Sequence, residues 1–162
     1  MDTTVRPIPE GHHTVTPYLT VDDAAAALAF YQQAFGAVET CRLSMPGGKI
    51  GHAEFSIGAS HFMISDEYPN AGTNSPTKLG GSSVKLHLYV TDVDASFARA
   101  IAAGAIETMP PINQFWGDRM GALVDPFGHH WLFATHIEDV DPSEFQIRMN
   151  TMFAANGCCS DA

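Results

Sequence analysis

The sequence has few basic residues and no long apolar run. Its 162 residues contain 8 lysines and arginines against 18 aspartates and glutamates, which gives a formal net charge of −10. This balance argues against nucleic acid and anionic membranes as partners, because their phosphate groups would be repelled. No apolar stretch reaches the length of a membrane span, and the opening MDTTVRPIPEGHH lacks the apolar centre of a signal peptide.

Cysteine is also scarce. The three cysteines are Cys41, Cys158 and Cys159, and an odd number with two adjacent residues predicts no disulfide framework. We therefore expect a cytoplasmic protein. The Cys158–Cys159 pair either binds metal or oxidises, or consists of bystander thiols in a loose tail, which is the interpretation we favour. With 45% apolar residues, the length predicts one domain with a real core.

An internal repeat is the clearest feature of what is present. Residues 18–39 resemble residues 88–107, and GAVE at 36–39 matches GAIE at 104–107. Two copies predict a duplicated supersecondary unit rather than a solenoid. In each copy an aspartate caps an alanine-rich helix, and a glycine stands where a left-handed C-cap is expected. The predicted helices are 24–35 and 94–103, and the predicted strands after them are 38–45, 49–57 and 60–66, then 106–114, 119–124 and 130–135.

The organisation that follows is one domain with two terminal extensions. Residues 1–13 are predicted to be a flexible arm, and residues 14–140 a single domain. Its modules span 14–66 and 83–135, and the Pro-, Gly-, Asn- and Ser-rich segment 67–82 is predicted to be a connecting loop. Residues 141–162 are predicted to form a helix and tail, in which apolar residues at helical spacing indicate packing.

Strand alternation separates two faces of the predicted sheet. One face is apolar and is expected to lie buried beneath the helices; it includes Val15, Leu19, Phe55, Leu86, Leu88, Trp131 and Phe133. The other face is rich in aromatic and ionisable groups and predicts a small-molecule cleft. It carries Thr16, Tyr18, His52, Glu54, His61, Met63, Lys85, His87, Tyr89, Arg119 and His130.

The stretch DPFGHHW, residues 125–131, joins a turn to a strand. Pro126 suits the second position of a β-turn, which predicts a turn over DPFG. His129 is then expected to be solvated at the turn exit. His130 is expected to point into the cleft, with an ordinary solvent-exposed strand histidine as the alternative.

Several segments together resemble a known family: TPYLTVDDAAAALAFYQQAFGA, GHAEFSIG, LHLYVTDVDASFARAIAAGA, QFWGDRMGALVDPFGHHW and THIEDV. Over residues 15–140 they resemble the vicinal oxygen chelate superfamily, and within it the PhnB-like branch of the glyoxalase/bleomycin-resistance group. The resemblance implies an α+β fold. Its two βαβββ modules would form an open, cup-shaped mixed sheet with helices on the outer face, and the protein would be a homodimer.

Metal-dependent members of this superfamily take ligands from the first and last strand of each module. Carried over by the resemblance, these positions, called here the usual metal positions, are Thr16, Met63, Lys85 and Leu132. None is a good ligand for a hard cation, and a lysine ammonium would repel one. We therefore expect no ion there and no glyoxalase I activity. A slip of two residues would put His87 in place of Lys85, but carboxylates would still be missing.

A different site is conceivable on the same face. Imidazoles and a carboxylate from His52, Glu54, His87 and His130 could bind Zn²⁺, Ni²⁺ or Fe²⁺, or a His–Glu pair could act as a general base, with Glu54 and His87 as catalytic candidates. The plain alternative is that Glu54 forms ion pairs with Lys85 or Arg119 across a wet cleft.

Two functional hypotheses follow, and a structural or interaction module is a third. The first is a binding protein of the antibiotic-sequestering kind that needs no cofactor. Its ligand contacts would come from Tyr18, Met63, Lys85, Tyr89, Trp116, Arg119 and His130. In it Trp116 would stack on a planar ligand and Arg119 would hold an anionic group, unless Arg119 only forms a surface Arg–Asp pair. The second is a metal-dependent or His/Glu-dependent lyase, isomerase or dioxygenase.

Overall fold

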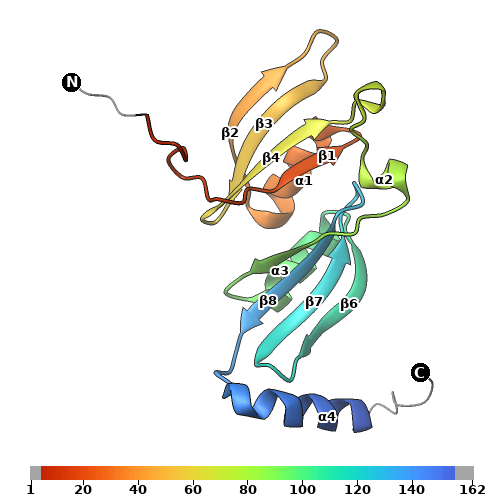
Figure 1. Ribbon diagram of the computed structural model, residues 1–162. Helices are drawn as coiled ribbons and strands as arrows, with labels where there is room; N and C mark the ends of the chain where they lie inside the picture. The colour runs from red at the N-terminus through yellow and green to blue at the C-terminus, as the bar shows by residue number, and fades with distance from the viewer. Residues whose placement is uncertain (1–4, 156–162) are drawn as a thin grey trace.

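The computed structural model describes residues 5–155 and contains the predicted repeat (Figure 1). The first unit comprises β1 (Tyr18–Val21), α1 (Ala24–Phe35), β2 (Val38–Ser44), β3 (Ile50–Ile57) and β4 (Ser60–Asp66). The second comprises β5 (Lys85–Tyr89), α3 (Val93–Ala102), β6 (Ile106–Asn113), β7 (Asp118–Val124) and β8 (His130–His136). The short helices η1 (Pro69–Ala71) and α2 (Pro76–Leu79) join them, and η2 (Pro142–Glu144) and α4 (Phe145–Ala155) follow.

Each unit forms its own four-stranded mixed sheet, in the orders β1-β4-β3-β2 and β5-β8-β7-β6. The pairs β1–β4 and β5–β8 are parallel, and the other neighbours are antiparallel. Figure 1 shows both sheets with α1 and α3 behind them, so their uncovered faces look the same way. The predicted α+β fold of paired βαβββ modules is therefore confirmed.

The two long helices begin and end where local chemistry places them. Asp23 caps α1 by accepting from the Ala26 N–H at 2.9 Å, and Asp92 caps α3 by accepting from the Ala95 N–H at 3.0 Å. Gly36 ends α1 with φ of 69°, a left-handed conformation that costs glycine little. The sequence signals for these helices are thus also their physical causes.

One aromatic core joins the two units. Phe35 on α1 contacts both Trp131 and Phe133 on β8, with ring centroids 4.7 and 5.3 Å apart. The ring centroids of Phe62 on β4 and Trp131 are 5.9 Å apart. These contacts link the helix-covered faces of both sheets, so neither unit has a core of its own.

A buried carboxylate closes this core. Asp125 Oδ2 accepts from the Tyr31 hydroxyl at 2.8 Å and from the Trp131 indole N–H at 2.9 Å. Its Oδ1 accepts from the backbone N–H groups of Phe127 and His129, both at 2.9 Å. The Gly128 N–H donates to the Asp125 carbonyl, so DPFG is a β-turn as predicted. Four donors from both units therefore satisfy one carboxylate that is removed from water.

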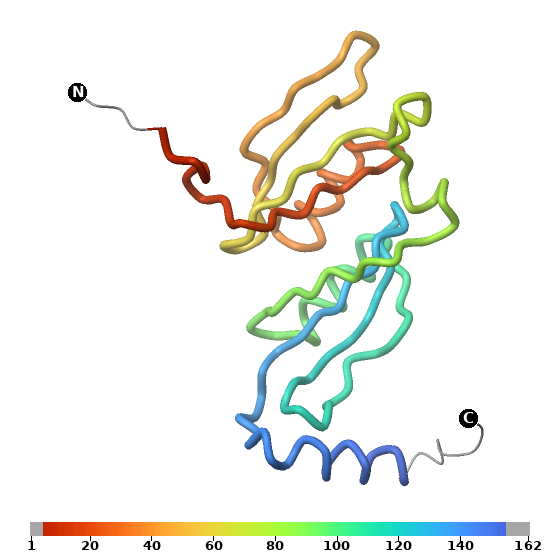
Figure 2. Tube along the Cα trace, viewed as in Figure 1, coloured from red at the N-terminus to blue at the C-terminus, as the bar shows by residue number. Residues whose placement is uncertain are grey.

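Three sequence predictions need correction here. Val15 is 82% exposed rather than buried, because β1 begins only at Tyr18 and the chain before Pro17 leaves the sheet. Leu86 and Leu88 are partly buried, since β5 is an edge strand at the border of the core. The segment 67–82 is not a plain loop, because Ser75 caps the short helix α2 within it. Figure 2 traces this segment from the end of β4 to β5.

The C-terminal helix α4 buries fewer apolar side chains than the helical spacing of its apolar residues predicts. Phe145, Ile147 and Phe153 on α4 are exposed, and only its middle residues are half-buried. Its firmest anchor is Arg148, which donates to the Glu138 carboxylate at 2.8 and 3.0 Å and to Glu144 at 2.9 Å. Cys158 and Cys159 lie outside the described residues. No helix within residues 5–155 is long and apolar enough to cross a membrane.

The Asp125 network predicts a contrast between two tyrosines. Tyr31→Phe removes one donor from a buried carboxylate, and we expect unfolding to become easier by about 1–3 kcal/mol. The Tyr68 hydroxyl is buried and has no hydrogen-bond partner within residues 5–155, so Tyr68→Phe should leave stability unchanged or raise it. Urea denaturation of both variants measures the difference. Equal losses in the two variants would contradict the assigned role of Asp125.

Candidate functional site

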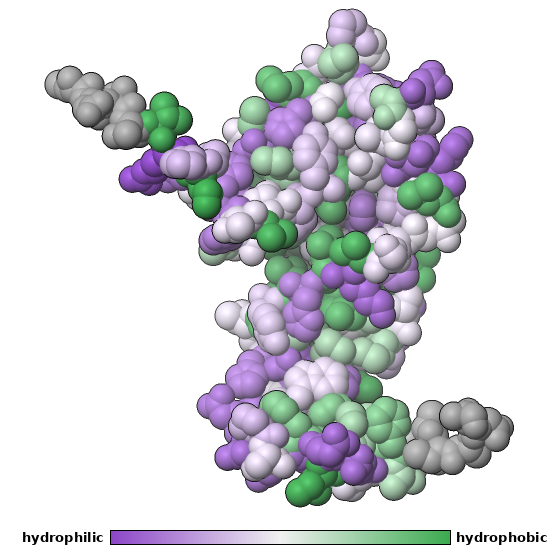
Figure 3. Space-filling model, in the orientation of Figure 1, coloured by the Kyte–Doolittle hydropathy of each residue, from purple (hydrophilic) through white to green (hydrophobic). Residues whose placement is uncertain are grey.

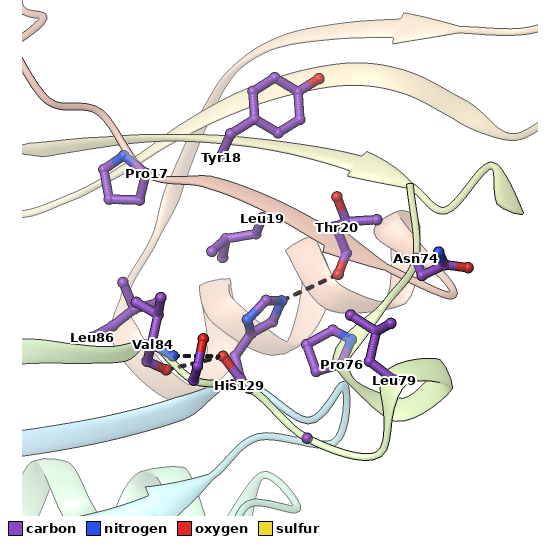
Figure 4. A pocket seen from close by; sticks show the side chains of 13 residues that line it. Pro17, Tyr18, Leu19, Thr20, Asn74, Pro76, Leu79, Val84, Leu86 and His129 are labelled. Atoms are coloured by element: carbon purple, nitrogen blue, oxygen red, sulfur yellow. Dashed lines mark hydrogen bonds between the residues drawn. The ribbon is translucent and has the colours of Figure 1, made fainter. Parts of the chain in front are cut away.

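A cavity lies between the two sheets (Figure 4). It has a volume of about 580 Å³ and separates the edge strand β1 from the start of β5, with the α2 segment along one side. Figure 3 shows apolar residues gathered at this level, between the upper and lower halves of the molecule. The lining residues are Pro17, Tyr18, Leu19, Thr20, Asn74, Pro76, Leu79, Gly81, Ser82, Ser83, Val84, Leu86 and His129.

His129 is the only ionisable side chain in that lining apart from the Tyr18 phenol. Its Nε2 lies 3.2 Å from the carbonyl oxygen of Thr20, so it bridges the second unit to the edge of the first. Burial lowers the pKa of His129, and the nearby Asp125 charge opposes this only in part. The expectation of a solvated His129 was therefore wrong, because the turn that carries it folds toward β1 rather than toward water.

The backbone of β1 also faces the cavity. The carbonyls of Pro17 and Val21 accept from β4, at 2.9 Å from Met63 N and 2.7 Å from Glu67 N. Alternation along a strand then directs the backbone groups of Tyr18 and Thr20 away from β4. The Thr20 carbonyl meets His129 on this side. The cavity thus combines apolar side chains with an unpaired strand edge.

A hydrogen-bonded chain of three side chains lies on the uncovered face of the first sheet. The Tyr18 hydroxyl is 2.9 Å from His52 Nδ1, and His52 Nε2 is 3.3 Å from Glu54 Oε1. Since an ionised carboxylate only accepts, the chain runs from the Tyr18 O–H through His52 to Glu54. Strand alternation assigned Tyr18, His52 and Glu54 to one face, and hydrogen bonds join these three side chains there.

The N-terminal segment covers part of this chain. His12 Nε2 lies 3.6 Å from Glu54 Oε2, and its ring stacks on His61 with centroids 5.1 Å apart. Gly11 approaches so closely that an added Cβ would stand 2.9 Å from the His61 ring. A second cavity of about 470 Å³ opens between this segment and the sheet, where Glu54 and Met63 line it.

The uncovered face of the second sheet carries a different cluster around buried Asp118. Its carboxylate accepts from the Tyr89 hydroxyl at 3.0 Å, the Trp116 indole at 2.9 Å and His136 Nδ1 at 2.8 Å. Burial alone would raise the pKa of Asp118, but these three donors together lower it. Hydrogen bonds to Asp118 and then Asp139 raise the pKa of His136, and the bond to Asp118 raises the pKa of Tyr89.

Arg119 was predicted to face the cleft, and this prediction was wrong. Its side chain lies on the helix side of β7 and forms a bidentate ion pair with Asp94 of α3. Nε donates to Asp94 Oδ2 at 2.8 Å and Nη2 donates to Oδ1 at 2.7 Å. Gly121, two residues on, meets Phe97 of α3, which fixes this side of the strand as the helix side. Asp118 therefore takes the position on the open face. The alternative of a surface Arg–Asp pair describes Arg119 better, with Asp94 as the partner.

The other predicted ligand contacts are divided between the sheets. Tyr18 borders the main cavity, whereas Tyr89 and Trp116 bind Asp118. His87 stacks obliquely on Tyr89, with centroids 4.7 Å apart, and lines a smaller cavity near Arg99. Lys85 is exposed and pairs in register with His130, which is half-buried. Glu54 contacts His12 and His52 rather than Lys85 or Arg119.

The usual metal positions do not fit a divalent cation. Register places Met63 beside Tyr18 and Leu132 beside His87, so a thioether and an alkyl group occupy two of the four places. Lys85 adds a positive charge, and the Thr16 hydroxyl donates to the His13 carbonyl. Such a donor set lacks the O and N ligands that Zn²⁺ or Fe²⁺ prefers.

The second metal hypothesis is also not assembled within one chain. His52 and Glu54 lie on β3, whereas His87 and His130 lie on strands of the other sheet. Over residues 5–155 no group of three or more His, Cys, Asp or Glu side chains is placed to hold a metal ion.

Sequence reasoning missed four residues that the structure brings into these sites. His129 follows a turn, His12 lies in the predicted flexible arm, Asp118 precedes the predicted strand 119–124, and His136 follows the predicted strand 130–135. Asp118 could have been found from the sequence. It is the neighbour of Arg119 in QFWGDR, and because successive strand residues point to opposite faces, only one of the two can lie on the open face. His129 meets a residue 109 positions away in sequence, which no local pattern reveals.

Comparisons with known proteins agree with this fold. The Glyoxalase/Bleomycin resistance protein/Dioxygenase superfamily matches residues 11–133, and the chain belongs to that superfamily. An uncharacterised protein of Mycobacterium tuberculosis is 44% identical over 140 residues, which cover 85% of this chain and 82% of the relative. TioX from Micromonospora sp. ML1 is 27% identical with a TM-score of 0.61, covering 77% of this chain and 99% of its own. A PhnB protein from Bacillus cereus is 21% identical with a TM-score of 0.61, covering 76% and 99%.

Opposite pKa shifts predict that two histidines titrate apart. By NMR we expect His136 to titrate above, and His129 below, the ordinary value of about 6.5. His136 then stabilises the fold fully below pH of about 6.5, and this contribution is lost as pH rises through its folded-state pKa. His129 acts in reverse: stability falls as acidification passes below about 6.5 toward its lowered pKa.

Asp118→Asn should bring the His136 midpoint back toward the ordinary value without moving that of His129, because of these two histidines only His136 bonds to Asp118. A common midpoint for both histidines, or a shift of both in this variant, would refute the assignment.

Proposed function

We propose that the protein is a PhnB-like binding protein that holds a small, predominantly apolar organic molecule in the cavity between the sheets, without a metal at the usual positions. The observation that carries this proposal is the cavity itself. At about 580 Å³ it falls in the size range of small-molecule sites. Pro, Leu and Val side chains form the apolar part of its walls. Its polar groups are the His129 imidazole, the edge of β1 and the side chains of Asn74, Ser82 and Ser83.

The assignment to the PhnB-like branch is part of the same proposal. It rests on the sequence segments quoted above, and the Bacillus cereus PhnB structure contributes the fold alone. A cytoplasmic location is likewise proposed, on the acidic composition and scarce cysteine.

A homodimer belongs to the proposal as well. Both sheets leave one face uncovered, and their outer strands β2 and β6 expose Val38, Leu43, Ile106 and Ile112. Unpaired edges with apolar side chains favour covering by a second chain. Sedimentation equilibrium should therefore give about twice the chain mass of 17.4 kDa at micromolar concentration. A mass of one chain would defeat this part of the proposal.

Filling the cavity tests the binding site. Val84 lines the cavity and is 62% exposed, so Val84→Trp should fill the space without damaging the core. We expect this variant to bind 2-methoxynaphthalene, a neutral apolar probe, at least about tenfold more weakly than the wild type in a fluorescence titration, because the indole excludes the probe.

Ile147→Trp is the matched control, because Ile147 is 68% exposed on α4 and does not line the cavity. Probe binding should survive in that variant. Equal loss in both variants, or no binding by the wild type, would overturn the proposed site.

A second candidate function is catalysis by the Tyr18–His52–Glu54 chain. Its polarity lets the Tyr18 oxygen take a proton from a substrate as its own hydroxyl proton passes to His52 Nδ1, and Glu54 then stabilises the positive charge on the His52 ring. This would suit a lyase or isomerase that removes a proton, and it needs no metal. Glu54 would be a positioning residue for His52, and Tyr18 would touch the substrate.

Two variants separate catalysis from binding. Tyr18→Phe should abolish turnover and leave probe binding nearly unchanged, since the ring remains. Glu54→Gln keeps the shape but removes the carboxylate charge, and should lower turnover and alter its pH profile. Unchanged turnover in Tyr18→Phe would exclude this mechanism, and elemental analysis of untagged protein would detect any metal that supports another one.

A further inference from the structure

The contact between His129 and Thr20 fixes the tautomer of the histidine. The Thr20 oxygen is a backbone carbonyl, which can only accept, so the Nε2 that lies 3.2 Å from it must carry a proton. Burial of the ring favours its neutral form. The neutral ring with a proton on Nε2 has a free electron pair on Nδ1.

Nothing in the described part of the chain donates to that Nδ1. The one bond of the ring goes from Nε2 to Thr20, and the His129 backbone N–H goes to Asp125. The hydroxyl of Ser82 in the lining is engaged with the backbone of Val84 at 3.0 and 3.2 Å. Figure 4 shows the ring between Val84 and Leu86 on one side and Pro76 on the other.

An acceptor among apolar walls imposes a requirement on what enters. Removing water from Nδ1 without replacing its hydrogen bond costs free energy, whereas a ligand hydroxyl or N–H recovers it. A ligand with only acceptors, such as an ether or ester, would set two electron pairs against each other. The chemistry of the cavity therefore discriminates between molecules of the same shape.

We infer that His129 determines specificity, and that the cavity selects apolar molecules that carry an O–H or N–H donor aimed at its Nδ1. This inference rests on the proposed function, because it concerns the ligand of the same cavity. It names a ligand class, for which phenols and aromatic amines are the simplest examples.

Two naphthalenes of nearly equal shape test it. 2-Naphthol has a hydroxyl donor, and 2-methoxynaphthalene has an ether oxygen in the same place. We expect the wild type to bind 2-naphthol roughly fivefold to tenfold more tightly, the size of one neutral hydrogen bond. Titration below the pKa of the free naphthol keeps both probes neutral.

Two substitutions of His129 divide its functions. His129→Gln keeps an N–H within reach of Thr20 but removes the acceptor at Nδ1, so the preference for 2-naphthol should disappear while binding of 2-methoxynaphthalene persists. His129→Asn places its amide oxygen near the former Nδ1 and loses the Thr20 contact, so the preference should survive. Circular dichroism and urea denaturation establish that both variants fold.

Ring ¹⁵N spectra give a readout that does not depend on affinity. The free protein should show a protonated Nε2 and an unprotonated Nδ1 for His129, and 2-naphthol alone should shift the Nδ1 resonance. Equal binding of both probes, or a proton on Nδ1, would overturn the inference and leave the proposed function standing. Failure of both probes to bind would overturn the proposed function and, with it, the inference.

Discussion

The Asp125 carboxylate is the constraint on which the rest of the molecule depends. It accepts hydrogen bonds from α1 of the first unit and from the turn and strand β8 of the second, so its burial is compatible with stability only when both units are in place. The same carboxylate holds the backbone of His129. The turn that completes the core thereby also sets the position of the imidazole in the cavity.

The cavity follows from how the core is shared. Because the helix-covered faces of both sheets meet through Phe35 and Trp131, the edge strands β1 and β5 come to face each other without pairing. The α2 segment borders the gap, and it packs so closely on the turn that an added Cβ at Gly128 would stand 3.0 Å from Pro76. A residue without a side chain at Gly128 is what allows this approach. The space left between two strand edges is the site.

Local patterns predicted the fold well because they are its causes. Helix caps at Asp23 and Asp92 and the period-2 strands placed most elements within a residue or two of their observed ends. The predicted strand alternation was wrong at Arg119, because its neighbour Asp118 lies on the open face instead. The candidate site was less predictable. Tyr18, His52 and Glu54 share a face by spacing alone, but His129 reaches Thr20 only through the tertiary fold, and no local pattern encodes that contact.

The two copies have diverged at corresponding places, and this explains the lack of a symmetric site. Register equates Tyr18 and Met63 of the first sheet with His87 and Leu132 of the second. Glu54 pairs with Met63 in the first sheet, and Ala122 pairs with Leu132 in the second. Glu54 and Ala122 therefore occupy equivalent positions. A metal shared by equivalent strands needs donors from both copies, and the second copy has a methyl group where the first has a carboxylate. The first sheet therefore carries the Tyr18–His52–Glu54 chain, and the second sheet carries the Asp118 cluster in its place. The second unit reaches the cavity through His129, from the turn between β7 and β8.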